Sequence, residues 1–102
     1  MSKGKCYIAG KITGIWPQAA VVKKFYEAKL HLLQEGYEPV SPIELAHQHD
    51  RTWNDYMKED IRALLQCDYL FALSDCGLSP GATIEIELAK KLGIKIIYQS
   101  HG

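Results

Sequence analysis

The chain has 102 residues, which suits one compact domain spanning residues 1–102 and leaves no room for a second hydrophobic core. Lysine and arginine together number 12, as do aspartate and glutamate, so no net charge favours nucleic acid or an anionic membrane as a partner. Three cysteines without a C-x-x-C spacing argue against a disulfide framework or a zinc knuckle. We therefore expect a cytoplasmic protein that takes a small molecule and needs no metal, cofactor, nucleic acid or membrane.

The first half of the chain predicts a strand, a helix and a second strand. Residues 5–10, KCYIAG, are a short apolar run, and Pro17 marks a helix entrance. A helical period then runs through residues 18–35 and is closed by Gly36. Its apolar positions are Val21, Val22, Phe25, Ala28, Leu32 and Leu33. The segment YEPVSP is predicted as an edge strand, because Pro39 cannot donate a ladder hydrogen bond.

The second half of the chain continues the alternation. Residues 53–67 predict a helix, 68–74 a buried strand, 80–92 a third helix and 94–98 a last strand. This order indicates an α/β fold: a flavodoxin-like or Rossmann-like three-layer sandwich whose parallel sheet of about four strands has the order 2-1-3-4. Ligands bind such sheets at the carboxyl ends of the strands, where the strand order reverses. The loops after the first and third strands are therefore expected to form the site.

Two glutamates of the third predicted helix face opposite ways. Glu85 falls on the apolar side, where a carboxylate is unfavourable unless it is paired, protonated or open to a polar cavity. That side also contains Ala82, Ile86, Leu88, Ala89 and Leu92. Glu87 lies on the opposite side beside Lys90 and Lys91, where it can pair with Lys91 at i+4 and solvate the surface.

The second predicted helix also carries an acid on its apolar side. Asp60 falls among Trp53, Tyr56, Met57, Ile61, Leu64 and Cys67. Two inward acids near the carboxyl edge of the third strand suggest a catalytic pair in a closed pocket. The alternative for Glu85 is local pairing of a partly buried side chain. Lys29 lies in the apolar stripe of the first helix in the same way, and there we expect a long side chain that reaches water.

The start of the third predicted helix suits an anion. Ser79 is a good N-cap and Pro80 a good first helical residue. The amides of Gly81, Ala82 and Thr83 would then point at the pocket mouth and bind an anion. The alternative is that Ser79 only caps its own helix.

Other polar residues carry weaker signals. Tyr7 lies on a central strand, where a buried phenol usually needs a hydrogen-bond partner, and its role is either in the core or in catalysis. His47 and His49 would need further ligands to hold a metal, and the pattern supplies none, so no metal site is expected.

Three segments together resemble the nucleoside 2-deoxyribosyltransferase superfamily: Y-I-A-G-K-I-T-G, W-N-D-Y-M-K-E-D-I-R-A-L-L-Q-C-D and S-P-G-A-T-I-E-I-E-L-A-K-K-L-G. The superfamily includes deoxynucleoside monophosphate N-glycosidases and small members common in phages. The resemblance implies a mechanism like that of retaining glycosidases, in which water or a second base resolves a covalent sugar–enzyme ester. Members often complete a neighbour's active site, so the resemblance also implies a homodimer or a higher homo-oligomer.

The resemblance implies a role for each candidate residue. Glu85 matches the nucleophile that attacks the anomeric carbon, and Asp60 matches the acid that helps to protonate or position the leaving base. Tyr7 resembles the tyrosine that holds the nucleophile's carboxylate. Ser79 is similar to a serine that binds a 5'-phosphate, and Gly10 to the glycine over the sugar.

The chain departs from the superfamily pattern at three positions. Glu87 replaces a glycine, and Lys11 and Thr13 occupy a loop where the monophosphate branch carries serine and arginine. The residues expected to bind substrate are Gly10, Lys11, Thr13, Ser79, Gly81 and Ala82.

The sequence supports an enzyme that cleaves or transfers the N-glycosidic bond of a 2'-deoxyribonucleoside or its 5'-monophosphate. A non-catalytic nucleotide-binding module, acting as a sensor or sponge, is the alternative suggested by the altered glycine loop. A second alternative is a nicotinamide-ribose glycohydrolase, which uses similar glutamate chemistry.

Overall fold

Strands and helices alternate along the part of the chain that the structure, a computed structural model, describes: residues 2–12, 19–44 and 53–99. In chain order the elements are β1 (Lys5–Ala9), α1 (Ala19–Gln34), β2 (Glu38–Val40), the 3-10 turn η1 (Pro42–Glu44), α2 (Trp53–Leu65), β3 (Tyr69–Ala72), the 3-10 turn η2 (Cys76–Leu78), α3 (Pro80–Leu92) and β4 (Lys95–Tyr98). The strands and α-helices follow the predicted order, and the two 3-10 turns were not predicted. The helix entrance predicted at Pro17 lies outside the described residues.

The four strands form one parallel sheet in the order β2-β1-β3-β4, which confirms the predicted topology. Tyr7 lies in the middle of β1, opposite Val40 of β2 on one side and Leu70 of β3 on the other. Strand β2 lies at an edge of the sheet, where Pro39 is tolerated. The strand order reverses between β1 and β3, so the loops that follow these two strands lie at the switch point.

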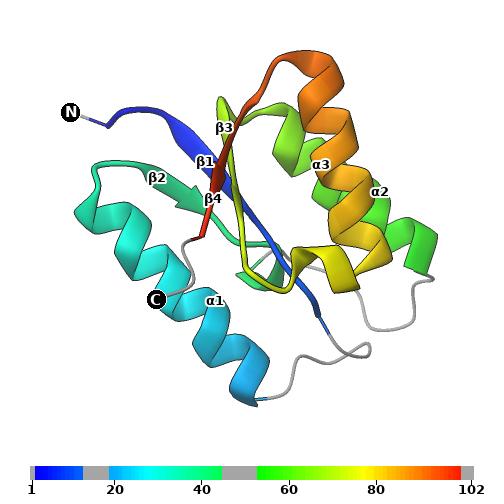
Figure 1. Cartoon of the computed structure of the whole chain (residues 1–102), viewed down its shortest axis with the longest axis horizontal. Helices are drawn as coiled ribbons and strands as arrows, with labels where there is room; N and C mark the ends of the chain where they lie inside the picture. Colours follow the sequence, from blue (N-terminus) through cyan, green and yellow to red (C-terminus); the bar gives the residue numbers. More distant parts are fainter. Residues whose placement is uncertain (1, 13–18, 45–52, 100–102) are drawn as a thin grey trace.

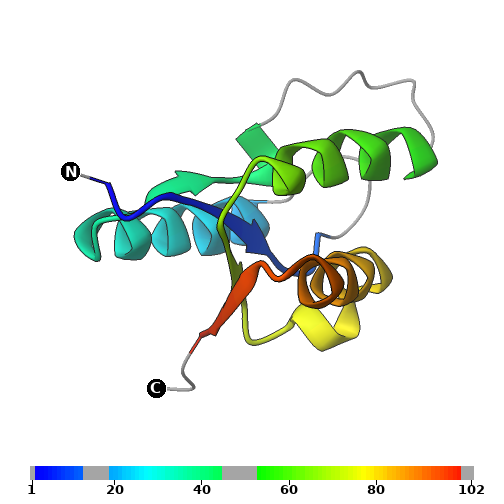
Figure 2. The same ribbon diagram turned by 90° about the horizontal axis from the view of Figure 1, so that it is seen from above.

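The helices cover both faces of the sheet and make three layers (Figures 1 and 2). Tyr7 and Ala9 of β1 pack in a cluster with residues of α2 and α3. Cys6 and Ile8 of the same strand point the other way and pack with α1. Because strand side chains alternate between faces, one strand contributes to both hydrophobic layers. None of the described helices is long and apolar enough to cross a membrane.

Glycines end two of the helices. Gly36 follows α1 with φ 91°, and Gly93 follows α3 with φ 75°, both in the left-handed region where a side chain is strained. Helix α2 ends at Leu65, two residues earlier than predicted. The Cys67 amide donates to the Leu64 carbonyl three residues earlier, so the chain ends the helix in a tighter 3-10 turn.

Three side chains predicted to face the core are instead exposed. Val22 and Leu33 of α1 are 45% and 51% exposed, and Leu92 of α3 is 53% exposed. The buried residues of α1 are Phe25, Ala28 and Leu32. They follow one another at three- and four-residue spacing, so a single narrow stripe of this helix meets the sheet.

Two expectations about surface charges hold only in part. Lys29 does not simply reach water, because its ammonium group lies 2.8 Å from a carboxylate oxygen of Glu44, in η1. Glu87 faces solvent as predicted, but its ion pair is with Lys90, at 3.9 Å and i+3, instead of Lys91. Both pairs are partly or largely exposed and contribute little to stability.

Gly10 follows β1 and is packed tightly against the residue that follows β3. A Cβ atom added at Gly10 would lie 2.4 Å from Cδ1 and 3.1 Å from Cβ of Leu73. Leu73 is itself buried and donates its amide to the Ala9 carbonyl at 2.8 Å. The glycine therefore lets the two loops at the switch point approach one another.

We predict that Gly10→Ala lowers the free energy of unfolding by about 1–3 kcal/mol, because the added methyl group overpacks against Leu73. Urea unfolding measures the change. The matched control is Gly77→Ala, since a Cβ at Gly77 meets nothing within 4 Å and should change stability by less than about 0.5 kcal/mol. Equal effects of the two substitutions would contradict the packing argument.

Candidate active site

A buried hydrogen bond joins the sheet to α3. The hydroxyl of Tyr7 donates to Oε2 of Glu85 over 2.6 Å. Tyr7 is fully buried on β1, and Glu85 is 4% exposed on α3. The phenol predicted to need a partner and the glutamate predicted to face inward are thus brought together, although 78 positions separate them in the sequence.

Local sequence explains how Glu85 reaches the sheet. Ala82 and Ala89, on the same side of α3, are both buried in the cluster that contains Tyr7. Positions 82, 85 and 89 repeat at three- and four-residue spacing and therefore line one face of the helix. Because alanine side chains are small, the helix can lie close to β1, and the longer glutamate spans the remaining distance to the phenol.

Burial makes Glu85 a weak acid. Loss of water is the largest effect and raises the pKa of Glu85 from 4.5 to about 8. The hydrogen bond from Tyr7 lowers this pKa, and the negative charge of Asp60 raises it. Burial and the charge of Glu85 also raise the pKa of Tyr7 well above its ordinary value, so the phenol remains a hydrogen-bond donor at neutral pH.

Asp60 lies on the inner side of α2 and is 8% exposed. Its charge contributes to the raised pKa of both Tyr7 and Glu85. Met57 and Leu64, one turn to either side on α2, are buried as well. The structure therefore places both predicted inward acids in the interior, one on each helix of this layer.

The start of α3 is capped by its own serine. The Ser79 hydroxyl accepts the Ala82 amide at 3.2 Å, and the Ser79 carbonyl accepts the Thr83 amide at 2.9 Å. The prediction that these amides are available to an anion is therefore wrong for Ala82 and Thr83. Gly81 has a packing role, because a Cβ there would lie 3.0 Å from the sulfur of Met57 on α2.

Two residues at the switch point were missed by the sequence analysis. Asp75 follows β3, and one of its carboxylate oxygens accepts the Lys11 amide at 3.1 Å. Lys24 of α1 binds the other oxygen. An acid just after the third strand was a signal available in the sequence, but Lys24 follows no pattern that identifies its partner. Thr13, predicted to bind substrate, lies outside the described residues.

No group of three His, Cys, Asp or Glu side chains in residues 2–12, 19–44 and 53–99 is arranged to hold a metal ion. His47 and His49 lie outside these ranges.

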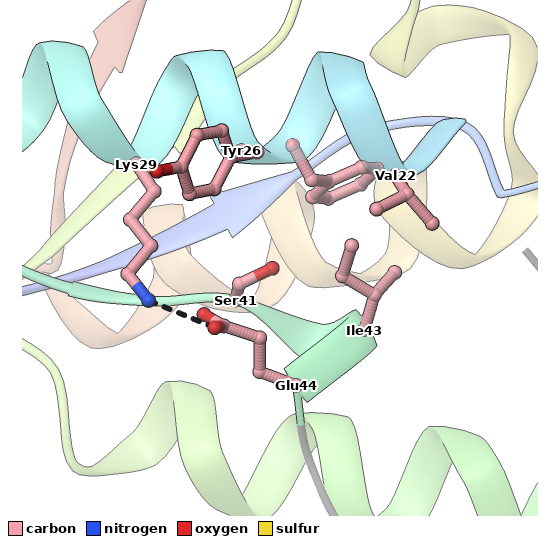
Figure 3. Close-up of a pocket in the computed structure, with 7 residues that line it drawn as sticks. Val22, Tyr26, Lys29, Ser41, Ile43 and Glu44 are labelled. Carbon is pink, nitrogen blue, oxygen red and sulfur yellow. Dashed lines mark hydrogen bonds and ion pairs between the residues drawn. The ribbon is translucent and has the colours of Figure 1, made fainter. Parts of the chain in front are cut away.

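A pocket lies between α1 and the segment that follows β2 (Figure 3). Phe25, Tyr26 and Ile43 contribute apolar walls, and the buried Ser41 hydroxyl has no hydrogen-bond partner in the structure. Its residues pack with the α1 layer, whereas Tyr7 and Glu85 lie in the layer of α2 and α3. The pocket therefore belongs to the opposite face from the candidate active site.

We predict that Glu85→Gln removes part of the pH dependence of stability. An acid whose pKa is raised in the folded state loses stability as the pH rises from its ordinary pKa to its folded pKa, because the unfolded chain releases the proton first. For Glu85 that window is pH 4.5 to about 8. The glutamine variant should therefore become more stable than wild type as the pH rises across this window. The difference in their free energies of unfolding should reach on the order of a few kcal/mol.

Urea unfolding at pH 5, 6.5 and 8 tests this prediction. Glu87→Gln is the matched control, because Glu87 lies on the exposed side of the same helix. For the control the difference from wild type should stay nearly constant with pH. A constant difference for Glu85→Gln would mean that this carboxyl is not a weak acid in the folded protein.

The fold is shared with a solved enzyme. A 2-deoxyribosyltransferase from the psychrotolerant bacterium Bacillus psychrosaccharolyticus, described as a biocatalyst for the synthesis of antiviral and antitumoral nucleosides, superposes with a TM-score of 0.71 at 20% sequence identity. The match covers 92% of this chain and 70% of the enzyme. At this identity the likeness shows a common fold.

Comparison with curated proteins gives no match. A family model described as "Domain of unknown function (DUF4406)" matches residues 4–98, nearly the whole chain. The chain belongs to this family.

Proposed function

We propose that this protein cleaves or transfers the N-glycosidic bond of a 2'-deoxyribonucleoside or its 5'-monophosphate, through a covalent ester between Glu85 and the sugar. The observation that carries the proposal is the buried Glu85 carboxyl, held by the Tyr7 hydroxyl and within the electrostatic reach of Asp60. The fold shared with a 2-deoxyribosyltransferase supports a nucleoside as the substrate. Burying a glutamate costs free energy, and packing alone would not compensate for that cost.

The first half of the proposed reaction forms the ester. An oxygen of the Glu85 carboxylate attacks C1' of the sugar, and the bond between C1' and the base nitrogen breaks. The electron pair of that bond leaves with the base, which Asp60 either protonates or positions for protonation. The sugar passes through a state with positive charge at C1', which a nearby carboxylate stabilises.

The second half resolves the ester. Water, or a nitrogen of a second base, attacks C1' as the bond from Glu85 breaks, and the Glu85 carboxylate is restored. Release of water's proton completes hydrolysis, whereas loss of a proton from the incoming base completes transfer. Free sugar and a new nucleoside are the respective products.

Tyr7 tunes the proposed nucleophile. The reactive form of Glu85 is the carboxylate, but burial favours the neutral acid. The phenol's hydrogen bond stabilises the charge and leaves Glu85 Oε2 oriented by the rigid central strand. In the proposed reaction, the hydrogen bond from Tyr7 therefore favours the ionised form of Glu85 and fixes the orientation of its carboxylate.

We predict that wild-type protein releases free base from at least one member of a panel of 2'-deoxyribonucleosides and their 5'-monophosphates. Chromatography measures the released base. Glu85→Ala should lose more than about 10³-fold in kcat/KM, as expected when a nucleophile is removed. Glu87→Ala, two positions away on the exposed side, should stay within a few-fold of wild type. Acid quenching during turnover, followed by intact mass, should show a deoxyribosyl adduct that is absent from the Glu85 variant.

The outcomes separate the proposed function from its rivals. Equal release by wild type and Glu85→Ala would refute the assignment of the nucleophile. Binding of a nucleotide by calorimetry with no free base would instead indicate a binding module. Release of nicotinamide from a ribosyl substrate, with deoxy substrates left intact, would indicate a nicotinamide-ribose glycohydrolase.

A further inference from the structure

One lysine and one aspartate join three separate segments at the carboxyl edge of the sheet. The ammonium group of Lys24, on α1, lies 2.5 Å from Oδ2 of Asp75 and donates to the Lys11 carbonyl at 2.8 Å. The other oxygen of Asp75, Oδ1, accepts the Lys11 amide at 3.1 Å. Both polar groups of the Lys11 peptide backbone are therefore held by this pair of charges, which we call the Lys24–Asp75 clamp.

The clamp is shielded from solvent more than an ordinary surface pair. The side chains of Lys24 and Asp75 are 29% and 27% exposed. Burial tends to raise the pKa of Asp75, but the hydrogen bonds from Lys24 and from the Lys11 amide outweigh it and leave the pKa below its ordinary value. Asp75 is thus ionised at neutral pH, and its hydrogen bonds are charge-assisted, the stronger kind.

The clamp lies between the loop after β1 and the segment that leads to Glu85. Lys11 follows Gly10, which already packs against Leu73. On the other loop, the Ser74 amide donates to the side-chain oxygen of Gln99 at 2.8 Å, so the residue before Asp75 is fixed as well. Four residues after Asp75, Ser79 caps the helix that carries Glu85. The clamp therefore ties the loop after β1 to the segment that leads into the helix of Glu85.

We propose that Lys24 and Asp75 are positioning residues that hold the backbone of Gly10 and Lys11 at a fixed separation from Glu85, and thereby set how tightly the sugar is bound. Neither residue takes part in bond making. The effect on substrate rests on the proposed function, whereas the effect on the loop does not. The two can therefore be tested separately.

The effect on the loop is tested by the rate of amide hydrogen exchange at Lys11, which NMR measures on the full chain. Lys24→Met and Asp75→Ala should each speed this exchange by about tenfold or more, the factor that corresponds to the loss of roughly 1.4 kcal/mol of protection. Asp75→Asn, which keeps an acceptor for the amide but loses the charge, should have a smaller effect and serves if Asp75→Ala does not fold. Lys29→Met is the matched control, because it removes another ion pair of α1 that does not contact Lys11.

The result that overturns the clamp is Lys11 exchange unchanged in all the folded Lys24 and Asp75 variants, or accelerated equally by Lys29→Met. This readout needs no turnover. If wild type releases no base, the proposed function fails while the exchange experiment still decides the clamp.

The substrate effect is tested with the deoxynucleoside that wild type cleaves fastest. Loosening a binding loop should raise KM about tenfold while kcat stays within a few-fold, and Lys29→Met should change neither. A fall in kcat at unchanged KM would contradict a role in sugar binding, even if Lys11 exchange responds as expected.

Discussion

A hydrogen bond between a phenol and a buried carboxyl group is the interaction on which the candidate active site depends. The carboxyl of Glu85 lies in the layer between the sheet and two helices, where water is excluded and a charge is unfavourable. Tyr7 is the group that opposes this effect directly, because its hydroxyl stabilises the ionised form. Asp60 acts in the opposite sense. The balance of these effects raises the pKa of Glu85 to about 8.

The fold supplies the geometry of this interaction. The middle of β1 is flanked by strands on both sides, so Tyr7 projects from a rigid backbone. Ala82 and Ala89 are the small residues that let α3 lie against the same layer, and Gly81 allows α3 to approach Met57 of α2. Gly10 has the same function at the switch point, where it lets the loops after β1 and β3 meet. Small residues thus bring the backbone elements together around the acids.

Much of this arrangement follows from sequence patterns, because those patterns arise from local geometry. Alternating strands and helices gave the order of the sheet, and the helical period located Glu85 and Asp60 on inner faces. Partners across the fold were harder to predict. Periodicity does not show that Lys24 meets Asp75, or that Lys29 meets Glu44, because those contacts depend on how loops fold back on α1. Two of the amides predicted to bind an anion at the start of α3 are paired for a related reason: the Ser79 hydroxyl accepts the Ala82 amide and the Ser79 carbonyl accepts the Thr83 amide.

The central claim is that Glu85 is a weak acid in the folded protein because it is buried against Tyr7. The most direct test is NMR of side-chain carboxyl carbons in protein labelled with 13C-glutamate, recorded from pH 4 to pH 10. We expect one carboxyl that titrates at about pH 8, is missing from Glu85→Gln, and titrates at higher pH in Tyr7→Phe, where the stabilising hydrogen bond is lost. If every glutamate titrates near its ordinary pKa, or if Tyr7→Phe leaves the Glu85 signal unmoved, the account is contradicted.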